Sequence, residues 1–214
     1  MSITTHRMRF PLSKEDALKL RAGDQVIIDG EIVVTAGMPT HERLLRALDG
    51  AEPLPLALQG QSLFHLGSFS REENGEFEVL YINPTTSTRF NPYMPRLIRE
   101  LELHATGGKG GLDAACVEAL RETGGVYLSF LGGGCTLLSS ALRKVLEVGW
   151  KDMLTHYRLV RLEVEGLGPA TVAIDAHGNS CYADVLKGAS ERLPKIMAAL
   201  DQQRSASQAN QYKE

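Results

Sequence analysis

The sequence predicts an α/β fold built around a β-sheet. Asp29 and Gly30 form a turn dipeptide between two runs rich in Val and Ile, which is a strong signal for a β-hairpin. Farther along the chain, strand-like runs alternate with helical stripes, and glycines stand at their junctions. Because such strand–loop–helix units present ligand-binding groups at the carboxyl ends of strands, the sequence also predicts where a site should lie.

β-Strands are expected wherever short runs of branched or aromatic residues are bounded by turn signals. In chain order these runs are residues 25–29, 31–35, 62–69, 77–82, 126–131, 158–164 and 171–174. Helices are expected where apolar residues recur at spacings of three and four. Their residues are 40–48, 94–101, 112–120, 138–145 and 193–200. The order is β-rich, then βαβα, then β-rich again with a final helix.

The composition fits one globular domain in a reducing cytoplasm. Hydrophobic residues make up 43% and charged residues 23% of the 214 residues, and the net charge of −3 argues against a nucleic-acid-binding protein. No apolar run approaches the ~20 residues that span a bilayer, and the N-terminus lacks the apolar core of a secretory signal. Three distant cysteines indicate neither a disulfide framework nor a CxxC metal site.

The domain is expected to occupy residues 1–201. From Gln202 to Glu214 the chain is polar and has no apolar periodicity. Such a segment cannot bury enough apolar surface to offset the entropy of ordering, so a disordered tail is expected there.

The segment that follows residues 77–82 gathers hydroxyls and one guanidinium, a set of donors suited to an anion. Its residues are Thr85, Thr86, Ser87, Thr88 and Arg89. Hydroxyls at this point can also cap a helix, and the two roles are compatible. In the functional interpretation a strand end and a helix N-terminus present hydroxyls and N–H groups to the anion, with Arg89 as a bidentate clamp.

A second candidate segment places Lys109 among four glycines, in the order Gly-Gly-Lys-Gly-Gly. A solvated surface lysine is the ordinary alternative. Glycine loses the most backbone entropy on folding, so four of them make sense where the backbone must approach a ligand closely. Gly108 and Lys109 are therefore candidate binding residues. The spacing of a P-loop is absent.

Other polar residues point less clearly to chemistry. His41 stands at the expected start of a helix, where a surface or capping histidine is the ordinary interpretation, although its titration range keeps it available. The remaining histidines are isolated and lack metal-ligand spacing. Cys135 follows three glycines at an expected helix N-terminus, but no histidine partner can be named, so packing is its expected role.

These motifs, in this order, resemble the β subunit or C-terminal domain of the iron–sulfur-dependent class I fumarase and L(+)-tartrate dehydratase family. The resemblance covers most of the chain, about residues 20–197. Four segments carry it: Pro-Thr-Thr-Ser-Thr-Arg at 84–89, Gly-Lys-Gly-Gly at 108–111, the glycines at 132–134, and Ile-Asp-Ala-His-Gly-Asn at 174–179. Each motif alone is weak evidence for the family, but all four together and in register are hard to produce by chance.

The resemblance implies a swivelling β/β/α three-layer domain that closes over an active site shared with an α subunit. In that family the α subunit holds a 4Fe–4S cluster through its own cysteines, and the open iron acts as a Lewis acid on the substrate. The cysteines of this chain need not be ligands. The resemblance further implies a small hydroxycarboxylate substrate and an oligomer of the αβ unit.

The resemblance also assigns roles to residues. Thr85 matches the hydroxyl proposed to handle the carbon-bound proton, and Thr86 lies beside it. Arg89 and Lys109 match the cations that bind the substrate carboxylates. A threonine hydroxyl is a poor base, so the two nearby cations are the expected cause of its activation.

One departure from the family pattern bears on the substrate. The family reads Arg-Asp-x-x-His before the first helix, and here His41 is kept while Gly37 and Met38 replace the arginine and aspartate. Losing a guanidinium from a dicarboxylate site should cost about 2–5 kcal/mol if the facing charge is unpaired. Either the substrate differs, with an apolar group near Met38, or the partner supplies the cation.

Two other functions remain open on the sequence. The chain could be a non-catalytic or regulatory carboxylate-binding domain, because the Arg-Asp pair is missing. It could also be a stand-alone hydrolase or transferase that uses Cys135.

Overall fold

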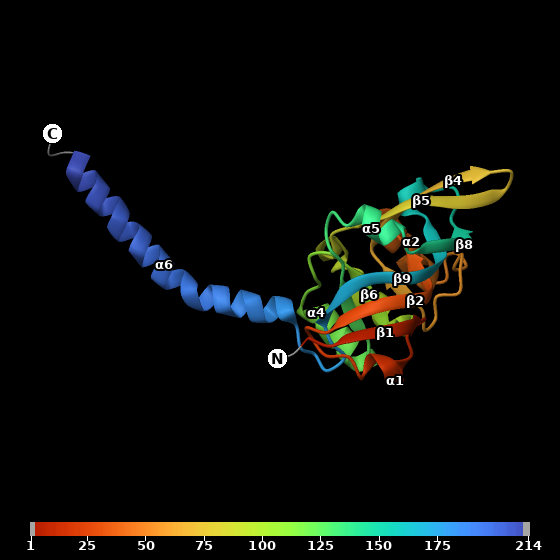
Figure 1. Ribbon diagram of the computed structural model, residues 1–214, viewed down its shortest axis with the longest axis horizontal. Coiled ribbons are helices and arrows are strands. Elements are labelled where there is room, and N and C mark those ends of the chain that lie inside the picture. The colour runs from red at the N-terminus through yellow and green to blue at the C-terminus, as the bar shows by residue number, and fades with distance from the viewer. Residues whose placement is uncertain (1–2, 212–214) are drawn as a thin grey trace. The chain divides into compact units, whose positions relative to one another are not determined.

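A computed structural model describes residues 3–211, with side chains to residue 205. The chain divides into two compact units, Met1–Ser180 and Cys181–Glu214 (Figure 1). The first unit holds all the strands and every helix but the last. The second unit is the helix α6, Cys181–Gln211. Within the described residues, no helix has both the length and the apolar character that a membrane crossing requires.

The first unit is a mixed α/β fold whose core is a seven-stranded sheet. The strands lie in the order β1-β2-β3-β6-β7-β9-β8, and β2 also pairs with β9. Five strands, β2, β3, β6, β7 and β9, therefore form a closed ring of hydrogen-bonded neighbours. The bounds are Thr5–Phe10 for β1, Gln25–Val34 for β2, Ser62–Phe64 for β3, Ala105–Gly108 for β6, Val126–Ser129 for β7, Leu142–Gly149 for β8 and Leu159–Ile174 for β9.

The pairings around this ring are of both kinds. The successive pairs β1–β2, β2–β3, β3–β6 and β6–β7 are parallel, whereas β9 runs antiparallel to β2, β7 and β8. The sheet encloses a core of fully buried side chains such as Ile28, Phe64 and Leu128. A second, two-stranded sheet pairs β4, Leu66–Glu73, with β5, Glu76–Pro84. This hairpin extends away from the main sheet (Figure 1).

Short helices connect the strands. They are α1, Lys14–Ala17; α2, Met38–Leu48; the 3₁₀ helix η1, Ser87–Phe90; α3, Met94–Glu100; α4, Ala114–Thr123; α5, Cys135–Ser139; and the 3₁₀ helix η2, Thr155–Tyr157. The apolar stripes predicted α2, α3 and α4. α3 and α4 bury their stripes, whereas α2 buries Leu44 but leaves Leu45 and Leu48 half-buried. The strand expected at residues 77–82 lies within β5, and β7 occupies the first four residues of the run at 126–131. The run expected at 62–69 is instead two strands, β3 in the main sheet and β4 in the hairpin.

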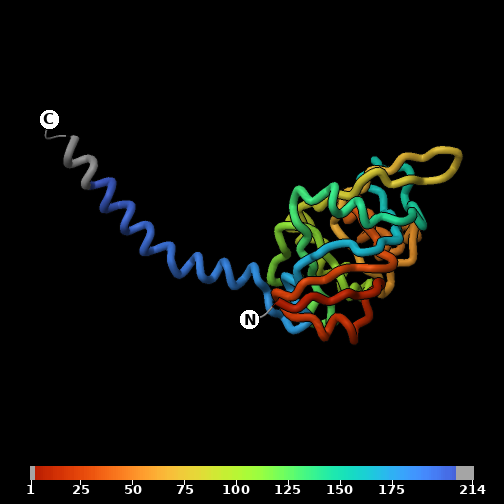
Figure 2. The backbone as a smooth tube through the Cα atoms, in the orientation of Figure 1, coloured from red at the N-terminus to blue at the C-terminus, as the bar shows by residue number. Residues whose placement is uncertain are grey.

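The hairpin predicted at Asp29-Gly30 is wrong, because β2 continues through both residues. Gly30 has a φ of +99° and lies at a register shift between β2 and β9, as glycine in a bulge does. A Cβ at this position would overlap the carbonyl oxygen of Phe10 on β1, and it would lie 3.2 Å from the Phe10 nitrogen. The backbone tube shows β2 and β9 side by side along much of their length (Figure 2).

Three further expectations need correction. Residues 158–164 and 171–174 belong to one strand, β9. The helix expected at 138–145 is replaced by the five-residue α5 and the strand β8, since its apolar spacing also suits a strand whose partner is β9. The segment from Gln202, expected to be disordered, is helical to Gln211, and its Gln, Arg and Ala residues are good helix formers. Residues 212–214 of the expected tail lie outside the described residues.

Candidate active site

Two segments distant in sequence meet at the carboxyl ends of β5 and β6. The Lys109 N–H donates to the carbonyl of Thr85 at 3.0 Å, and the Ser87 N–H donates to the carbonyl of Lys109 at 2.8 Å. Thr86 and Lys109 thereby form a parallel β-bridge outside the main sheet. Thr85 and Thr86 are half-buried, as is Lys109. The backbone of this pair of turns thus joins the hydroxyl segment to the lysine loop.

Arg89 is anchored by the same segment. Its guanidinium Nη2 donates to Thr85 Oγ1 at 2.9 Å, while the rest of the side chain is exposed. Thr86, at the N-cap of η1, makes no side-chain capping bond, so the alternative of a capping hydroxyl does not hold for this residue. The hydroxyl of Thr85 therefore lies against a positive charge, and a positive charge favours the ionised form of a neighbouring hydroxyl.

Arg89 and Lys109 have no acidic partner. Most arginines of the first unit lie within 4 Å of a carboxylate, as Arg96 and Arg99 do. Across residues 3–211, no Asp or Glu side chain makes an ion pair with Arg89 or Lys109. Two unneutralised cations on adjoining turns suit an anion supplied from outside the chain.

Gly107 and Gly108 are both needed for close packing, Gly107 against β7 and Gly108 against the neighbouring turn. A Cβ at Gly107 would lie 2.5 Å from the carbonyl oxygen of Leu128. At Gly108 it would overlap the Ser87 hydroxyl, and it would lie 3.0 Å from both His65 Cβ and the Thr85 carbonyl oxygen. Gly108 is buried, so its side of the turn faces the protein. In the structure Gly107 therefore packs closely on β7, and Gly108 packs closely on the neighbouring turn.

Gly108→Ala should lower the free energy of unfolding by about 1–3 kcal/mol, because the added methyl group overpacks a buried contact. Gly132→Ala is a matched control, since a Cβ there would meet only Lys109 Cδ, at an ordinary 3.5 Å. Urea unfolding of the two variants should show a loss for the first and a change within about 0.5 kcal/mol for the second. Equal stabilities would contradict the proposed packing role of Gly108.

The surface or capping position predicted for His41 is wrong, because the side chain is fully buried. Its ring stacks on Phe90 with centroids 4.1 Å apart, and it lies 5.2 Å from the ring of His65. Nδ1 of His41 lies 2.6 Å from the carbonyl oxygen of Gly37 and donates to it. The ring packs behind η1, where it supports the segment that carries Arg89.

The two buried histidines should make the protein less stable in mild acid. Burial lowers the pKa of His41 to about 4, against the opposing hydrogen bond to the Gly37 carbonyl. Burial, together with the charges of His41 and Arg89, lowers the pKa of His65 well below its ordinary value. The unfolded chain therefore binds more protons than the folded chain as pH falls from 6.5 toward 4, so stability is lost over this window.

From these values His41 should contribute a loss of about 2 kcal/mol between pH 7 and pH 5. Free energies of unfolding in urea at the two pH values check this expectation. His41→Gln should reduce the difference between them, since Gln does not titrate. The same difference in both proteins would contradict it.

Comparison with known proteins agrees with this arrangement of motifs. The family described as Fumarase C-terminus matches residues 3–185. The chain belongs to this family. The match to the Fumarase C-terminus family ends just after α6 begins at Cys181, so nearly all of that helix lies outside it.

The chain is similar both to separate subunits of about its own length and to part of a longer protein. The putative L(+)-tartrate dehydratase subunit beta of Methanocaldococcus jannaschii is 34% identical over 187 residues, covering 87% of this chain and 95% of that protein. L(+)-tartrate dehydratase subunit beta of Escherichia coli K12 is 28% identical over 187 residues, covering 87% and 91%. The putative fumarate hydratase class I of Geobacillus stearothermophilus is 32% identical over 195 residues, covering 88% of this chain and 36% of that longer protein.

The space beside Gly37, where the family's arginine is expected from the sequence, is filled by an aromatic ring. A Cβ at Gly37 would lie 2.8 Å from the ring of Tyr157, and it would overlap the hydroxyl of Thr40. Thr40 in turn donates to the carbonyl of Tyr157. Met38, which replaces the aspartate, is 42% exposed. No longer side chain fits at position 37 while Tyr157 occupies this place.

The cysteines of this Fumarase C-terminus member do not fit a cluster site. In the described part of the chain, no three His, Cys, Asp or Glu side chains lie together as metal ligands would. Cys116 is buried, and burial raises the pKa of its thiol. Cys135 Sγ lies 3.9 Å from the hydroxyl of Ser139. Neither thiol has the histidine partner that a nucleophilic cysteine requires.

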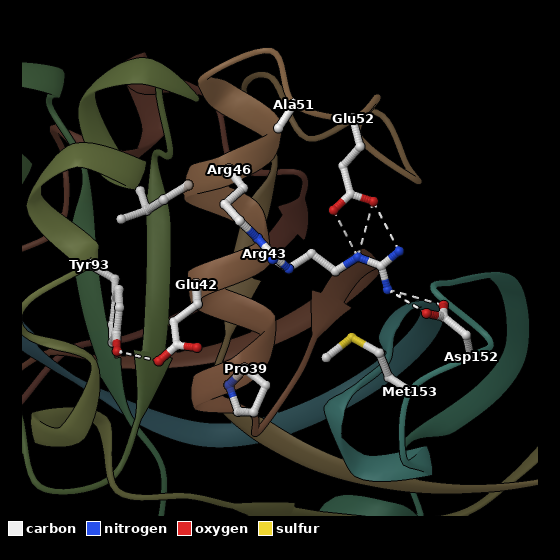
Figure 3. Close-up of a pocket in the computed structure, with 10 residues that line it drawn as sticks. Pro39, Glu42, Arg43, Arg46, Ala51, Glu52, Tyr93, Asp152 and Met153 are labelled. Atoms are coloured by element: carbon white, nitrogen blue, oxygen red, sulfur yellow. Dashed lines mark hydrogen bonds and ion pairs between the residues drawn. The ribbon is translucent and has the colours of Figure 1, made fainter.

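A wide pocket on the outer face of α2 contains none of the predicted site residues (Figure 3). Its volume is about 880 Å³. Arg43 in this pocket binds both Glu52 and Asp152, and its guanidinium lies 4.6 Å from the centre of the Trp150 ring. The Arg43 guanidinium is thus already neutralised and stacked, whereas Arg46 in the same pocket makes no ion pair with the described residues. The preference for Arg89 and Lys109 therefore rests on the two adjoining turns that carry them.

Sequence reasoning missed the residues that support the site from below. His65 lies between β3 and β4 and is fully buried, as is the Tyr127 side chain on β7. Ser87 appeared only as one hydroxyl of the cluster, but its side chain points into the interior. Isolated residues of this kind carry no spacing signal in the sequence.

Proposed function

We propose that this chain is the β subunit of a hydro-lyase of the fumarate hydratase or tartrate dehydratase type, acting on a small hydroxycarboxylate. The names of its relatives support this proposal. The observation that carries it is the pair of cations without acidic partners, Arg89 and Lys109, on turns joined through Thr85. In this proposal Arg89 and Lys109 bind carboxylate groups of the substrate. Thr86 and Gly108 shape the turns that carry these cations, and the buried His41 packs beneath them.

Thr85 is proposed to exchange the proton on the substrate carbon. Its hydroxyl accepts a hydrogen bond from the Arg89 guanidinium, and this positive charge favours the ionised form of the hydroxyl. The same contact orients the hydroxyl toward the place where a bound carboxylate would meet Arg89. A hydroxyl held in place beside bound substrate is the arrangement that proton transfer needs.

The remaining chemistry is proposed to come from a partner. We propose an α subunit that carries the 4Fe–4S cluster, with this chain as a swivelling β/β/α three-layer domain that closes over the shared site. The αβ unit would act as an oligomer in the cytoplasm. The ring of Tyr157 in the place beside Gly37 favours a substrate with an uncharged group there, or a cation supplied by the α subunit.

Co-expression with the α subunit under anaerobic conditions tests the proposal. The purified complex, with its cluster intact, should turn over at least one of fumarate, L(+)-tartrate and their methyl-substituted analogues. If no analogue is hydrated or dehydrated, the alternative of a non-catalytic carboxylate-binding domain is favoured. That alternative rests on the loss of the family's Arg-Asp pair at Gly37 and Met38.

A further inference from the structure

A line of buried hydrogen bonds runs beneath the two turns of the proposed site. The Gly111 N–H donates to the Tyr127 hydroxyl at 3.3 Å, and that hydroxyl donates to Ser87 Oγ at 2.9 Å. Ser87 Oγ lies 2.8 Å from Nδ1 of His65. The side chains of Tyr127, Ser87 and His65 are all fully buried. Buried polar groups in such a chain strengthen one another and are costly to leave unpaired.

The direction of these bonds follows from their first member. A backbone N–H can only donate, so the Tyr127 oxygen accepts from Gly111 and uses its own hydrogen toward Ser87. The Ser87 hydrogen then has His65 Nδ1 as its acceptor. This direction favours the tautomer of His65 with the ring hydrogen on Nε2, a buried atom that has no partner among the described residues. The opposite tautomer would leave the Ser87 hydrogen without an acceptor in a buried site.

This chain of hydrogen bonds connects the backbone segments on both sides of Lys109. At one end it holds Gly111, two residues after the lysine. At the other end His65 donates its N–H to the Gly107 carbonyl at 2.6 Å and accepts the Thr85 N–H at 2.8 Å. Ser87, in the middle, donates its N–H to the Lys109 carbonyl. Each of the three residues therefore contacts either the lysine loop or the segment before Arg89.

We propose that Tyr127, Ser87 and His65 are positioning residues that fix the spacing between Lys109 and Arg89, and thereby set the affinity for a carboxylate. None of the three contacts the substrate in this proposal. The inference rests on the proposed carboxylate site for its effect on affinity. The bond directions and the tautomer of His65 stand independently of that site.

Tyr127→Phe is the test variant, because it removes one oxygen atom and keeps the buried ring. Calorimetric titration of the full chain with L(+)-tartrate and with fumarate should show a dissociation constant raised roughly tenfold for the better-bound acid, as expected when Gly111 and Ser87 each lose a buried partner. Ser87→Ala should act in the same direction. Tyr93→Phe is the matched control, since its hydroxyl binds only the exposed Glu42, and it should leave the constant unchanged.

Imidazole ¹⁵N spectra separate positioning from a general loss of structure. Wild-type His65 should show the pattern of an Nε2–H tautomer, and Tyr127→Phe should change that pattern and shift the amide signals of Lys109 and Gly110. An unchanged dissociation constant would overturn the proposal, and so would a raised constant with an unchanged His65 pattern. If the wild-type chain alone binds neither acid, the spectra decide whether the three residues position the loop, and turnover by the αβ complex decides the proposed function.

Discussion

Replacing Thr85 by valine is expected to lower the turnover number of the αβ complex by about 10²- to 10⁴-fold, the range that one group in acid–base catalysis supplies. Valine has nearly the shape of threonine but has no hydroxyl, so it can neither take nor give a proton. The hydroxyl that it removes is the one bound by the Arg89 guanidinium at 2.9 Å. Steady-state kinetics with the best substrate of the wild-type complex measure the effect.

Thr88→Val is the matched control, since Thr88 lies in the same segment but is exposed. Its turnover number should stay within a factor of about two of the wild type, as for most surface substitutions. The affinity of the Thr85→Val chain for the substrate should fall less than its turnover, because both cations remain. Full activity of Thr85→Val would remove this residue from the catalytic step.

Removing either free cation is expected to weaken carboxylate binding by about 2–5 kcal/mol, the cost of leaving a charge without its partner. Lys109→Met keeps most of the side-chain stem and removes the ammonium group. Arg89→Lys keeps a positive charge but loses the planar fork that can bind a carboxylate through two bonds, so it should bind more tightly than Arg89→Ala yet less tightly than the wild type. Calorimetric titration with the preferred acid ranks the variants.

The control for the cation variants is Arg143→Met. Arg143 is also an arginine of the first unit, but it binds Glu165, and removing an exposed ion pair changes stability little. Its affinity for the acid should equal that of the wild type. If Lys109→Met and Arg143→Met bind equally well, the two turns are not the carboxylate site.

The sequence predicted those elements whose signal is local. α3 and α4 carry apolar stripes that need only a neighbouring surface, and the β run expected at residues 77–82 lies within β5. β2 was misread because its true partner, β9, lies far along the chain. The bulge at Gly30 and a local turn use the same residue types, so only the tertiary pairing distinguishes them.

The sequence predicted those features of the candidate site that depend only on the chemistry of neighbouring residues. Hydroxyls beside Arg89, and a lysine among glycines, indicated anion binding, and the family resemblance placed Thr85 among them. That the two segments share a β-bridge is a result of the sheet order, in which β6 follows β3. The buried roles of His65 and Tyr127 depend on contacts between elements distant in sequence, for which a single sequence carries no signal.

A crystal structure of the αβ complex with bound fumarate or L(+)-tartrate would show whether the turns that carry Arg89 and Lys109 form the carboxylate site. We expect a carboxylate within hydrogen-bond distance of both the Lys109 ammonium and the Arg89 guanidinium, with the Thr85 hydroxyl facing a substrate carbon. An acid bound elsewhere, with Arg89 and Lys109 in contact only with water or with the partner's own carboxylates, would contradict it.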